Sequence, residues 1–283
     1  MNKKKPLILI GLPVYNGEKY INRAIKSVFS QSYENFILYI SDNASTDRTS
    51  KICSEFKKNK KVKYYKHKKN IGAVNNFIYL KNINDKLKCD FFIYLAHDDY
   101  WSNNYLAELV KNIKKTDFGI RGDTHNVDSN ESFISKIGVT SFNQGEITKI
   151  FYQNEKFCKG LYIYSLFNND KFIKFNLKKY FSNLHGADPY LSIFFLQFGN
   201  LRVINTCIHF YRTHRDASSF LMGRSNFGIY RLEYYFLPIR QYMFLNKNLN
   251  TKITLHTFFA KFFKSIIDII LRSIIFLLTN KKY

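Results

Sequence analysis

Apolar positions in the first hundred residues follow two alternating periods. Short unbroken apolar runs are typical of strands buried on both faces of a sheet, whereas apolar pairs spaced by three or four residues indicate a helix. Strands are predicted at 7–11, 36–40, 62–67 and 91–96, and helices at 20–29, at 45–56 and after the turn at 67–77. This alternation predicts an α/β fold whose strands are parallel and joined by right-handed crossovers.

The polar residues of this region gather where the predicted strands end. The strand-end segments are PVYN at 13–16, DNASTD at 42–47, NIG at 70–72 and HDD at 97–99. Parallel sheets bind ligands at the carboxyl ends of their strands, so we expect these segments to form one ligand site. The first strand is followed neither by a G-x-G-x-x-G dinucleotide fingerprint nor by a G-x-x-x-x-G-K-[ST] phosphate loop.

Two adjacent acids, Asp98 and Asp99, follow the fourth predicted strand. Adjacent carboxylates repel each other and are costly to bury, and a hard divalent cation such as Mg²⁺ or Mn²⁺ removes that cost. A metal held by one or two carboxylates usually keeps waters and binds substrate phosphates. Metal ligation is therefore predicted for Asp98. The alternative is that one of the acids caps the helix predicted to begin at Ser102, and for Asp99 the two roles are equally well supported.

The second half of the chain has fewer legible patterns. GIRGDTHNVDSN predicts a strand followed by a turn, 160–167 predicts an apolar strand or buried segment, and 203–211 predicts another strand. Asp188 stands where an apolar helix begins and can cap it, and Pro189 suits the first helical position. Arg212 and His214 follow the last strand on a predicted loop, where an arginine and a histidine suit a diphosphate and its metal.

Composition narrows the class of protein. The 283 residues, 46% of them hydrophobic and 18% aromatic, exclude a disordered chain and suit one large domain or two small ones. The net charge of +23 and the lysine cluster at 57–69 favour anionic surfaces over specific nucleic-acid binding, because no RNP-like or zinc-finger pattern accompanies them. The four cysteines form no C-x-x-C pair, which indicates a reducing compartment and neither a zinc knuckle nor a redox motif.

Residues 255–278 form an apolar stretch near the end of the sequence. Its four charges, Lys261, Lys264, Asp268 and Arg272, recur every three or four positions and so lie in one helical stripe. A central charge in a membrane span costs about 2.5–3.5 kcal/mol, so the stripe predicts a helix lying in the membrane surface. The alternative is a helix that packs on the rest of the chain or on a second copy.

The ordered set of strand-end motifs resembles the family 2 glycosyltransferases of the GT-A fold. PVYN, DNASTD, N-I-G-x-x-x-N and a D-x-D-like end follow the four strands in the order seen in that family. The resemblance covers residues 6–220. It implies a Rossmann-like, mostly parallel sheet flanked by helices. It also implies a nucleotide-sugar donor, a UDP-sugar foremost, a divalent metal, Mn²⁺ or Mg²⁺, and inversion at the anomeric carbon.

The resemblance also assigns roles to individual residues of the donor site. The residues expected around the donor nucleotide are Pro13, Val14, Tyr15, Asn16, Asp42 (at the base), Asn70, Gly72, His97 and Asp98. The family's first acid is replaced by Ala96, while the second, the closer metal ligand, is kept as Asp98. His97 has a purely structural role as its alternative. The expected metal ligands are Asp98 and His214, with Asp99 as a further candidate.

The same resemblance extends to the predicted acceptor half. Asp188 matches the acid that serves as general base, although the glutamate that usually precedes it is Ala187. Capping and catalysis do not exclude each other at this position. Tyr211, Arg212 and His214 match a Tyr-Arg-x-His segment, which implies that Arg212 and His214 meet the diphosphate.

These features predict an inverting, metal-dependent glycosyltransferase that builds cell-surface polysaccharide on a glycan or polyprenyl-linked acceptor. We expect a GT-A domain at 1–220, made of a nucleotide-sugar half (1–100) and an acceptor half (101–220), and a helical, membrane-associating extension at 221–283. The expected location is the cytoplasm, peripheral on the anionic inner face of the cell membrane, and a homodimer through the C-terminal helix is the alternative use of the extension.

Two other functions stay open at this point. A sugar nucleotidyltransferase would need a basic, glycine-rich triphosphate loop after the first strand, where PVYNGEK is a poor candidate. A non-catalytic protein of the same fold, binding through its basic surface, is kept open by Ala96 and Ala187, which stand where the family usually has acids.

Overall fold

A computed structural model describes residues 5–146, 161–181, 188–214 and 247. The chain divides into two compact units, one of residues 1–146 and 153–214 and one of residues 147–152 and 215–283. Every helix and strand below belongs to the first unit. The predicted C-terminal extension, with the stretch at 255–278, lies outside the described residues, so its helix and its membrane or dimer contact stay predictions, as does the boundary near residue 220.

Strands and helices alternate through the first half of the chain. The strands are β1 (Ile8–Val14), β2 (Phe36–Asp42), β3 (Val62–Lys66), β4 (Phe91–Tyr94), β5 (Tyr100–Trp101), β6 (Asp117–Val127), β7 (Phe133–Ile137), β8 (Leu166–Asn168) and β9 (Asn200–Arg212). The helices are α1 (Ile21–Phe29), α2 (Thr49–Glu55), α3 (Ala73–Leu87), α4 (Tyr105–Asn112), α6 (Asn169–Phe172), α7 (Leu177–Phe181) and α8 (Asp188–Phe195), with 3₁₀ turns at Phe56–Lys58 and Leu161–Tyr164.

The described strands form one mixed sheet in the order β3-β2-β1-β4-β8-β6-β9-β5, with β7 paired to β6. The first four strands are parallel, and their register sets Val14 beside Asp42 and Gly11 beside Tyr94. β8 then runs antiparallel to both β4 and β6, while β9 runs parallel to β6. The parallel arrangement predicted for the first half is confirmed, and the second half is mixed.

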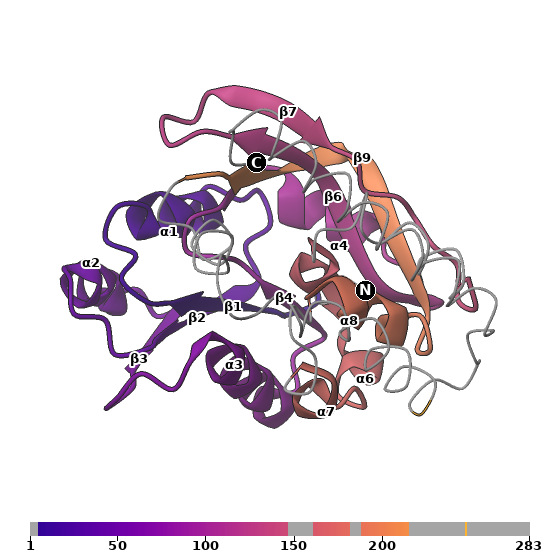
Figure 1. The fold of residues 1–283 in the computed structure, drawn as a ribbon, viewed down its shortest axis with the longest axis horizontal. Coiled ribbons are helices and arrows are strands. Elements are labelled where there is room, and N and C mark those ends of the chain that lie inside the picture. Colours follow the sequence, from indigo (N-terminus) through magenta and orange to yellow (C-terminus); the bar gives the residue numbers. More distant parts are fainter. Residues whose placement is uncertain (1–4, 147–160, 182–187, 215–246, 248–283) are drawn as a thin grey trace, which may run out of the picture. The chain divides into compact units, whose positions relative to one another are not determined.

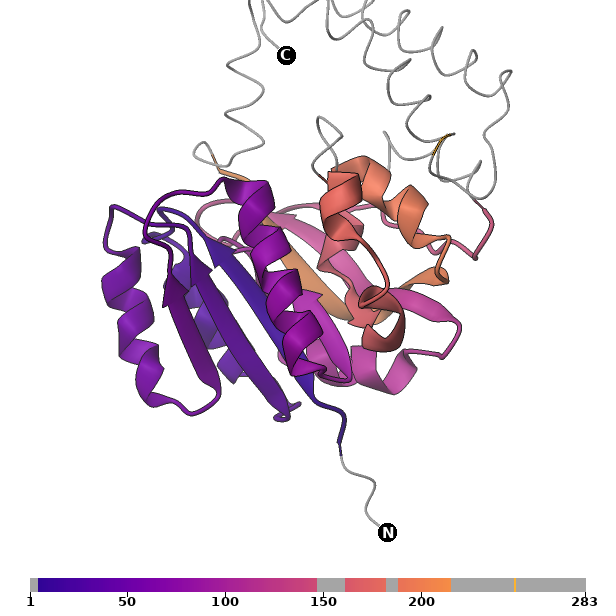
Figure 2. The same ribbon diagram turned by 90° about the horizontal axis from the view of Figure 1, so that it is seen from below.

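Helices cover both faces of the parallel strands (Figure 1). On one face, Ile21, Ile25 and Val28 of α1 are fully buried in a cluster with Ile8 and Ile10 of β1. α3 lies across the other face (Figure 2). The helical stripe predicted at 20–29 is therefore the face of α1 that packs on the sheet, and its burial supplies hydrophobic stabilisation.

The second half of the sheet has an aromatic core of its own. Phe118 of β6 lies within 6.0 Å, between ring centroids, of several other phenylalanines. These partners are Phe167, Phe172, Phe175, Phe195 and Phe198. Aromatic pairs add about 0.5–1.5 kcal/mol beyond the burial of their area. The short elements β8, α6 and α8 are thus held against β6 by ring packing.

Two elements differ from the predictions. The chain forms β5 after Asp99, and α4 begins at Tyr105, with Asn104 as the residue before it, instead of at Ser102. β7 follows a turn at 128–132 and makes a hairpin with β6 that the sequence pattern did not predict. Within the described residues, no helix is long and apolar enough to cross a membrane.

Candidate functional site

The turn after β1 is fastened to the loop after β2. Asn16 adopts a left-handed backbone conformation, with φ at 49°. Its backbone N–H donates to Ser45 Oγ at 3.0 Å, and its side-chain oxygen accepts from the backbone N–H of Thr46 at 2.9 Å. The predicted nucleotide segments at 13–16 and 42–47 therefore lie in direct contact. Tyr15, in the first of these segments, is 44% exposed.

The loop after β3 joins the same group. Asn43 Nδ2 donates to Asn70 Oδ1 at 2.8 Å, and that oxygen also accepts from the backbone N–H of Gly72 at 2.8 Å. Gly72 has a φ of 84°, a conformation that glycine adopts without steric cost, and it leads directly into α3. The structure thus brings Asn70 and Gly72 beside the β2 loop, as the parallel topology predicts.

Asp42 has a structural role in this arrangement. Its side chain is fully buried, Oδ1 accepts from the backbone N–H of Ser45, and Oδ2 accepts from Ser50 and Tyr64, each at 2.8 Å. Burial raises the pKa of this carboxyl, but the hydrogen bonds from Ser45, Tyr64 and Ser50 outweigh burial and the pKa is lowered. Both oxygens therefore hold the loop after β2 in place, and the contact of Asp42 with the base stays a prediction.

Asp98 and His214 meet at the end of β4. Asp98 Oδ2 lies 3.0 Å from His214 Nε2, across 116 positions of sequence. The ring of Tyr20, at the start of α1, packs on the His214 ring with centroids 4.7 Å apart. Burial raises the pKa of Asp98, but the charges of His97 and His214 outweigh it, so the pKa is lowered and the carboxylate is ionised at neutral pH.

His97 connects this loop to the turn after β1. A Cβ placed on Gly17 would come within 2.5 Å of the His97 ring, so the ring packs where glycine leaves room for it. The HDD loop, the PVYN turn and the β2 and β3 loops consequently form one continuous edge of the sheet. The prediction that the strand-end segments gather in one place is confirmed for these residues.

Asp99 points away from Asp98 and is 2% exposed. One of its oxygens lies 2.9 Å from His209 Nε2, and the other accepts from the backbone N–H of Arg212 at 2.9 Å. Asp99 does not cap α4, which begins at Tyr105, and both of its oxygens are engaged within the protein, so its candidacy as a metal ligand stays a prediction. It fastens the HDD loop to β9.

Arg212 is also buried and fully engaged. Its Nε donates to the backbone carbonyl of Asp98 at 2.9 Å, and its terminal nitrogens donate to the carbonyls of Asp128 and Ser129 and to the carboxylate of Glu131. With 2% of its surface exposed, the guanidinium is directed at protein acceptors. These bonds make Arg212 a support of the Asp98 loop, and its contact with a diphosphate stays a prediction.

The pair of Asp98 and His214 fits a divalent cation. An octahedral Mg²⁺ binds its ligands at about 2.0–2.1 Å, which places neighbouring ligand atoms about 3 Å apart. The two side-chain atoms already have this spacing, at 3.0 Å. Among the described residues there is no group of three His, Cys, Asp or Glu side chains that could hold a metal. A metal held by only one or two protein ligands usually keeps waters and binds substrate phosphates.

The predicted general base, Asp188, is the first described residue after the gap at 182–187. α8 begins at Asp188, as the sequence predicts. The side chain of Asp188 lies outside the described part of the chain, so its role as a base stays a prediction. Ala187, before it, also lies outside.

The structure adds three residues that sequence reasoning missed: Glu131, His209 and Arg121. Glu131 accepts hydrogen bonds from Arg212 and from Arg23 of α1. His209 and Arg121 are fully buried, with His209 Nδ1 3.5 Å from an Arg121 nitrogen. His209 and Arg121 belong to strands with little apolar periodicity, and Glu131 belongs to a hairpin turn, so no sequence signal linked them to Asp98 or Asp99.

The sequence of this chain is similar to glycosyltransferases of one family. A family model described as "Glycosyl transferase family 2" matches residues 9–180. A Methanococcus voltae protein named as a dolichyl N-acetyl-alpha-D-glucosaminyl phosphate 3-beta-D-2,3-diacetamido-2,3-dideoxy-beta-D-glucuronosyltransferase is 30% identical over 181 residues, which cover 59% of this chain and 54% of that one. The chain spans about half the length, or less, of the curated relatives it matches.

Two solved structures share the fold. S. aureus TarS 1–349 in complex with UDP-GlcNAc has a TM-score of 0.61 and 17% identity, and the match covers 97% of this chain and 76% of that one. The mannosyltransferase PcManGT from Pyrobaculum calidifontis, in complex with GDP-Man and Mn²⁺, has a TM-score of 0.54 and 11% identity, covering 90% and 68%. These likenesses confirm the GT-A-like α/β fold expected from the sequence.

Proposed function

Since this chain belongs to glycosyl transferase family 2, we propose that it transfers a sugar from a nucleoside-diphosphate donor to the hydroxyl group of a glycan or lipid-linked acceptor. The contact of Asp98 with His214 is the observation that carries the proposal. It unites the end of the fourth strand with a residue far along the chain, at the sheet edge where parallel α/β folds bind ligands.

The donor nucleotide is proposed to bind along the loops that follow β1, β2 and β3. The hydrogen bonds from Thr46 to Asn16 and from Asn43 to Asn70 hold these loops together before a ligand arrives, which lowers the entropic cost of binding. Pro13, Val14 and Tyr15 lead into this group, and His97 borders it. A UDP-sugar is the proposed donor, in line with the UDP-GlcNAc bound to TarS.

Asp98 and His214 are proposed to hold Mn²⁺ or Mg²⁺. Such an ion would stabilise the charge that develops on the departing diphosphate. The ionised Asp98 supplies an oxygen ligand, and His214 supplies Nε2 once that nitrogen is unprotonated. PcManGT was solved with GDP-Man and Mn²⁺, which supports the choice of metal.

Transfer is proposed to proceed by a single displacement with inversion. The acceptor oxygen forms a bond to the anomeric carbon while the bond from that carbon to the diphosphate oxygen breaks. The electron pair leaves with the diphosphate, and the acceptor proton passes to the carboxylate of Asp188. A base at the start of a helix has a fixed position, which suits this geometry.

The acceptor is proposed to be a growing cell-surface glycan or a polyprenyl-linked sugar at the cytoplasmic face of the membrane. Two observations support it. The Methanococcus voltae relative is named for a dolichyl-linked acceptor, and the net charge of +23 favours anionic lipid surfaces.

The experiment combines donor binding with turnover. Thermal unfolding with UDP and Mn²⁺, followed by a donor-hydrolysis assay over a panel of nucleotide sugars, should show Mn²⁺-dependent stabilisation and release of a nucleoside diphosphate. Asp98→Asn should lower kcat/KM by more than about 100-fold and abolish the Mn²⁺ effect on UDP binding. Asp188→Asn should lower kcat by about 10²–10⁴-fold and leave UDP binding unchanged.

The exposed Asp170, changed to Asn, is the control and should behave like the wild type. Full activity of Asp98→Asn would contradict the metal assignment, and full activity of Asp188→Asn would contradict the base. A wild-type protein that binds UDP with Mn²⁺ but never turns over any donor would favour the second candidate, a non-catalytic binder. The observation behind that candidate is Ala96, where the family usually has an acid.

A further inference from the structure

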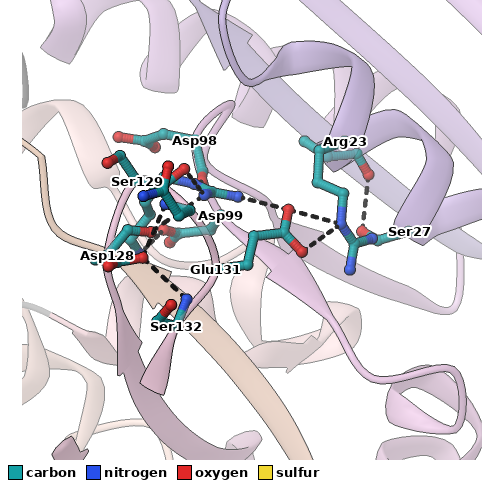
Figure 3. Close-up of polar contacts among 11 residues, drawn as sticks. Arg23, Ser27, Asp98, Asp99, Asp128, Ser129, Glu131 and Ser132 are labelled. Carbon is teal, nitrogen blue, oxygen red and sulfur yellow. Dashed lines mark hydrogen bonds and ion pairs between the residues drawn. The ribbon is translucent and has the colours of Figure 1, made fainter. Parts of the chain in front are cut away.

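The carboxylate of Glu131 accepts hydrogen bonds from two arginines, Arg23 and Arg212, and Figure 3 shows it facing Arg23. Arg23 Nε donates to both of its oxygens, at 3.0 and 3.1 Å, and a terminal nitrogen of Arg212 donates to Oε1 at 3.1 Å. Arg23 also stacks on the ring of Tyr100, with its guanidinium carbon 3.9 Å from the ring centroid. One carboxylate therefore ties α1 to the end of β9.

Glu131 has an unfavourable backbone conformation. Its φ is 69°, in the left-handed region where glycine is the favoured residue and any other residue pays a steric cost. The turn is closed by hydrogen bonds from the backbone N–H of Glu131 to the carbonyl of Asp128 and from the N–H groups of Asn130 and Ser132 to Asp128 Oδ1. None of these bonds needs a side chain at position 131, so the turn itself does not account for a strained glutamate there, whereas the two arginine contacts do.

Those contacts lead to the proposed metal ligands. Arg212 Nε donates to the carbonyl oxygen of Asp98, so the guanidinium fixes the backbone that carries this ligand. The second ligand, His214, is two residues beyond Arg212. The guanidinium is 2% exposed, and Glu131 is its only carboxylate partner among the described residues. Without this counter-charge the buried guanidinium would be left with carbonyl oxygens and the faces of Tyr20 and Tyr100, which compensate a cation more weakly than a carboxylate and hold it less firmly.

We propose that Glu131 is a positioning residue that holds Arg212, and through Arg212 both Asp98 and His214, at the spacing a divalent cation requires. The inference rests on the proposed function, since it concerns the same metal. The hairpin of β6 and β7, which contributes no ligand, thereby sets the affinity for the ion. Outer-shell partners of metal ligands typically change metal affinity or activity by about 10–100-fold when they are lost.

The test uses the full chain with Glu131→Gly and Glu131→Gln. The glycine variant relieves the backbone strain and removes the carboxylate, whereas glutamine keeps the size of the side chain and removes its charge. Mn²⁺ binding is measured in the presence of UDP, from free Mn²⁺ by electron paramagnetic resonance and from the Mn²⁺ concentration that gives half-maximal thermal stabilisation. Both variants should bind Mn²⁺ about tenfold more weakly or worse. UDP binding in EDTA should stay at the wild-type level, which a general loss of structure would not allow.

Lys88→Gly is the matched control. Lys88 is exposed, has a φ of 50° and ends α3 without touching this network, so the glycine relieves a similar strain and should leave Mn²⁺ affinity unchanged. Unchanged Mn²⁺ affinity in folded Glu131→Gly and Glu131→Gln would overturn the inference while leaving the proposed function intact. A wild-type protein that binds no Mn²⁺ with UDP would overturn both. Should Glu131→Gly fail to fold, the glutamine variant decides alone.

Discussion

Neighbouring residues with the same chemistry have different roles in this protein. Asp98 and Asp99 are adjacent acids, yet Asp98 lies beside His214 while Asp99 is buried against His209. A turn at the end of β4 sends the two side chains in different directions. The costly pair of acids is thus separated, one facing the proposed metal site and the other compensated within the sheet.

The partners of Asp99 also determine a proton position. Arg121 can only donate, so His209 Nδ1, 3.5 Å from an Arg121 nitrogen, is the accepting nitrogen of the ring. The other nitrogen, Nε2, then carries the proton and donates to Asp99 at 2.9 Å. Burial raises the pKa of Asp99, and the hydrogen bond from His209 opposes that rise.

This arrangement predicts the effect of Asp99→Asn. The carboxylate accepts from His209 on one oxygen and from the backbone N–H of Arg212 on the other. An amide in either orientation sets its NH₂ group against one of these donors. We expect a loss of about 1–3 kcal/mol in the free energy of unfolding, measured by urea denaturation. The exposed Asp170→Asn should lose almost nothing, and equal stability of Asp99→Asn and wild type would contradict the assigned hydrogen bonds.

At the scale of elements, the site is built by loops that hold one another. Ala44 has a φ of 61°, a left-handed conformation that costs a non-glycine residue about 1–2 kcal/mol. The residues on both sides of Ala44 are held by hydrogen bonds. Ser45 donates its backbone N–H to Asp42 and accepts at its hydroxyl from the N–H of Asn16. The side chain of Asn43 accepts from the N–H of Ile71. The loop after β2 is therefore a rigid support on which the turns after β1 and β3 rest.

The pH dependence of stability tests this support. The pKa of Asp42 is lowered in the folded state, so its contribution is present above the unfolded pKa, near 4, and is lost as the pH falls through the lowered value. At pH 7 we expect Asp42→Asn to be less stable by about 1–3 kcal/mol, because an amide oxygen and NH₂ cannot accept from Ser45, Ser50 and Tyr64 together.

At pH 3, below the unfolded pKa, the difference between Asp42→Asn and wild type should shrink, because the unfolded wild-type chain then binds a proton that the folded carboxylate, with its lowered pKa, resists. Urea denaturation midpoints of both proteins at the two pH values provide the measurement. A difference that stays constant between pH 7 and pH 3 would show that the charge of Asp42 does not support the loop.

At the scale of the whole molecule, charge is distributed unevenly. Seven lysines between positions 57 and 69 are exposed, on the 3₁₀ turn after α2, on the edge strand β3 and on the loop beyond it. They are Lys57, Lys58, Lys60, Lys63, Lys66, Lys68 and Lys69. None forms an ion pair with an acid of the described residues. Lysines on an edge strand also discourage strand pairing between molecules.

These lysines have two proposed roles, which are binding to an anionic membrane surface and protection of the edge strand. A vesicle-binding experiment separates the two. The full chain should sediment with phosphatidylglycerol vesicles and not with phosphatidylcholine vesicles, and binding should weaken steeply between 50 and 200 mM salt, as expected for electrostatic attraction on the order of 1 kcal/mol per lysine. Changing Lys58, Lys60 and Lys63 to Glu should weaken binding, whereas the edge strand stays protected because its residues are still charged.

The control changes Lys86, Lys88 and Lys115 to Glu, which alters the net charge equally at exposed positions elsewhere. If both triple variants lose vesicle binding equally, binding depends on net charge alone and not on the lysines between positions 57 and 69. Binding that persists in 200 mM salt would reject the electrostatic account.

Much of the parallel half of the fold can be predicted from the sequence alone. Buried parallel strands need continuous apolar runs, and a helix on one face needs an apolar stripe, so β1, α1, β2 and β4 could be located from local patterns. The ends of parallel strands necessarily meet at one edge, which is why Asn16, Asn70 and Asp98 could be predicted to lie together.

Only the tertiary structure decided what each polar residue does there. Whether Asp42 or Arg212 is free to bind a ligand depends on partners tens of residues away, such as Tyr64 and Glu131, and nothing local to either residue reveals them. The same holds for the antiparallel return through β8 and for the pairing of Asp99 with His209. Local periodicity determines which segments become buried, whereas the fate of a buried charge depends on what the fold packs against it.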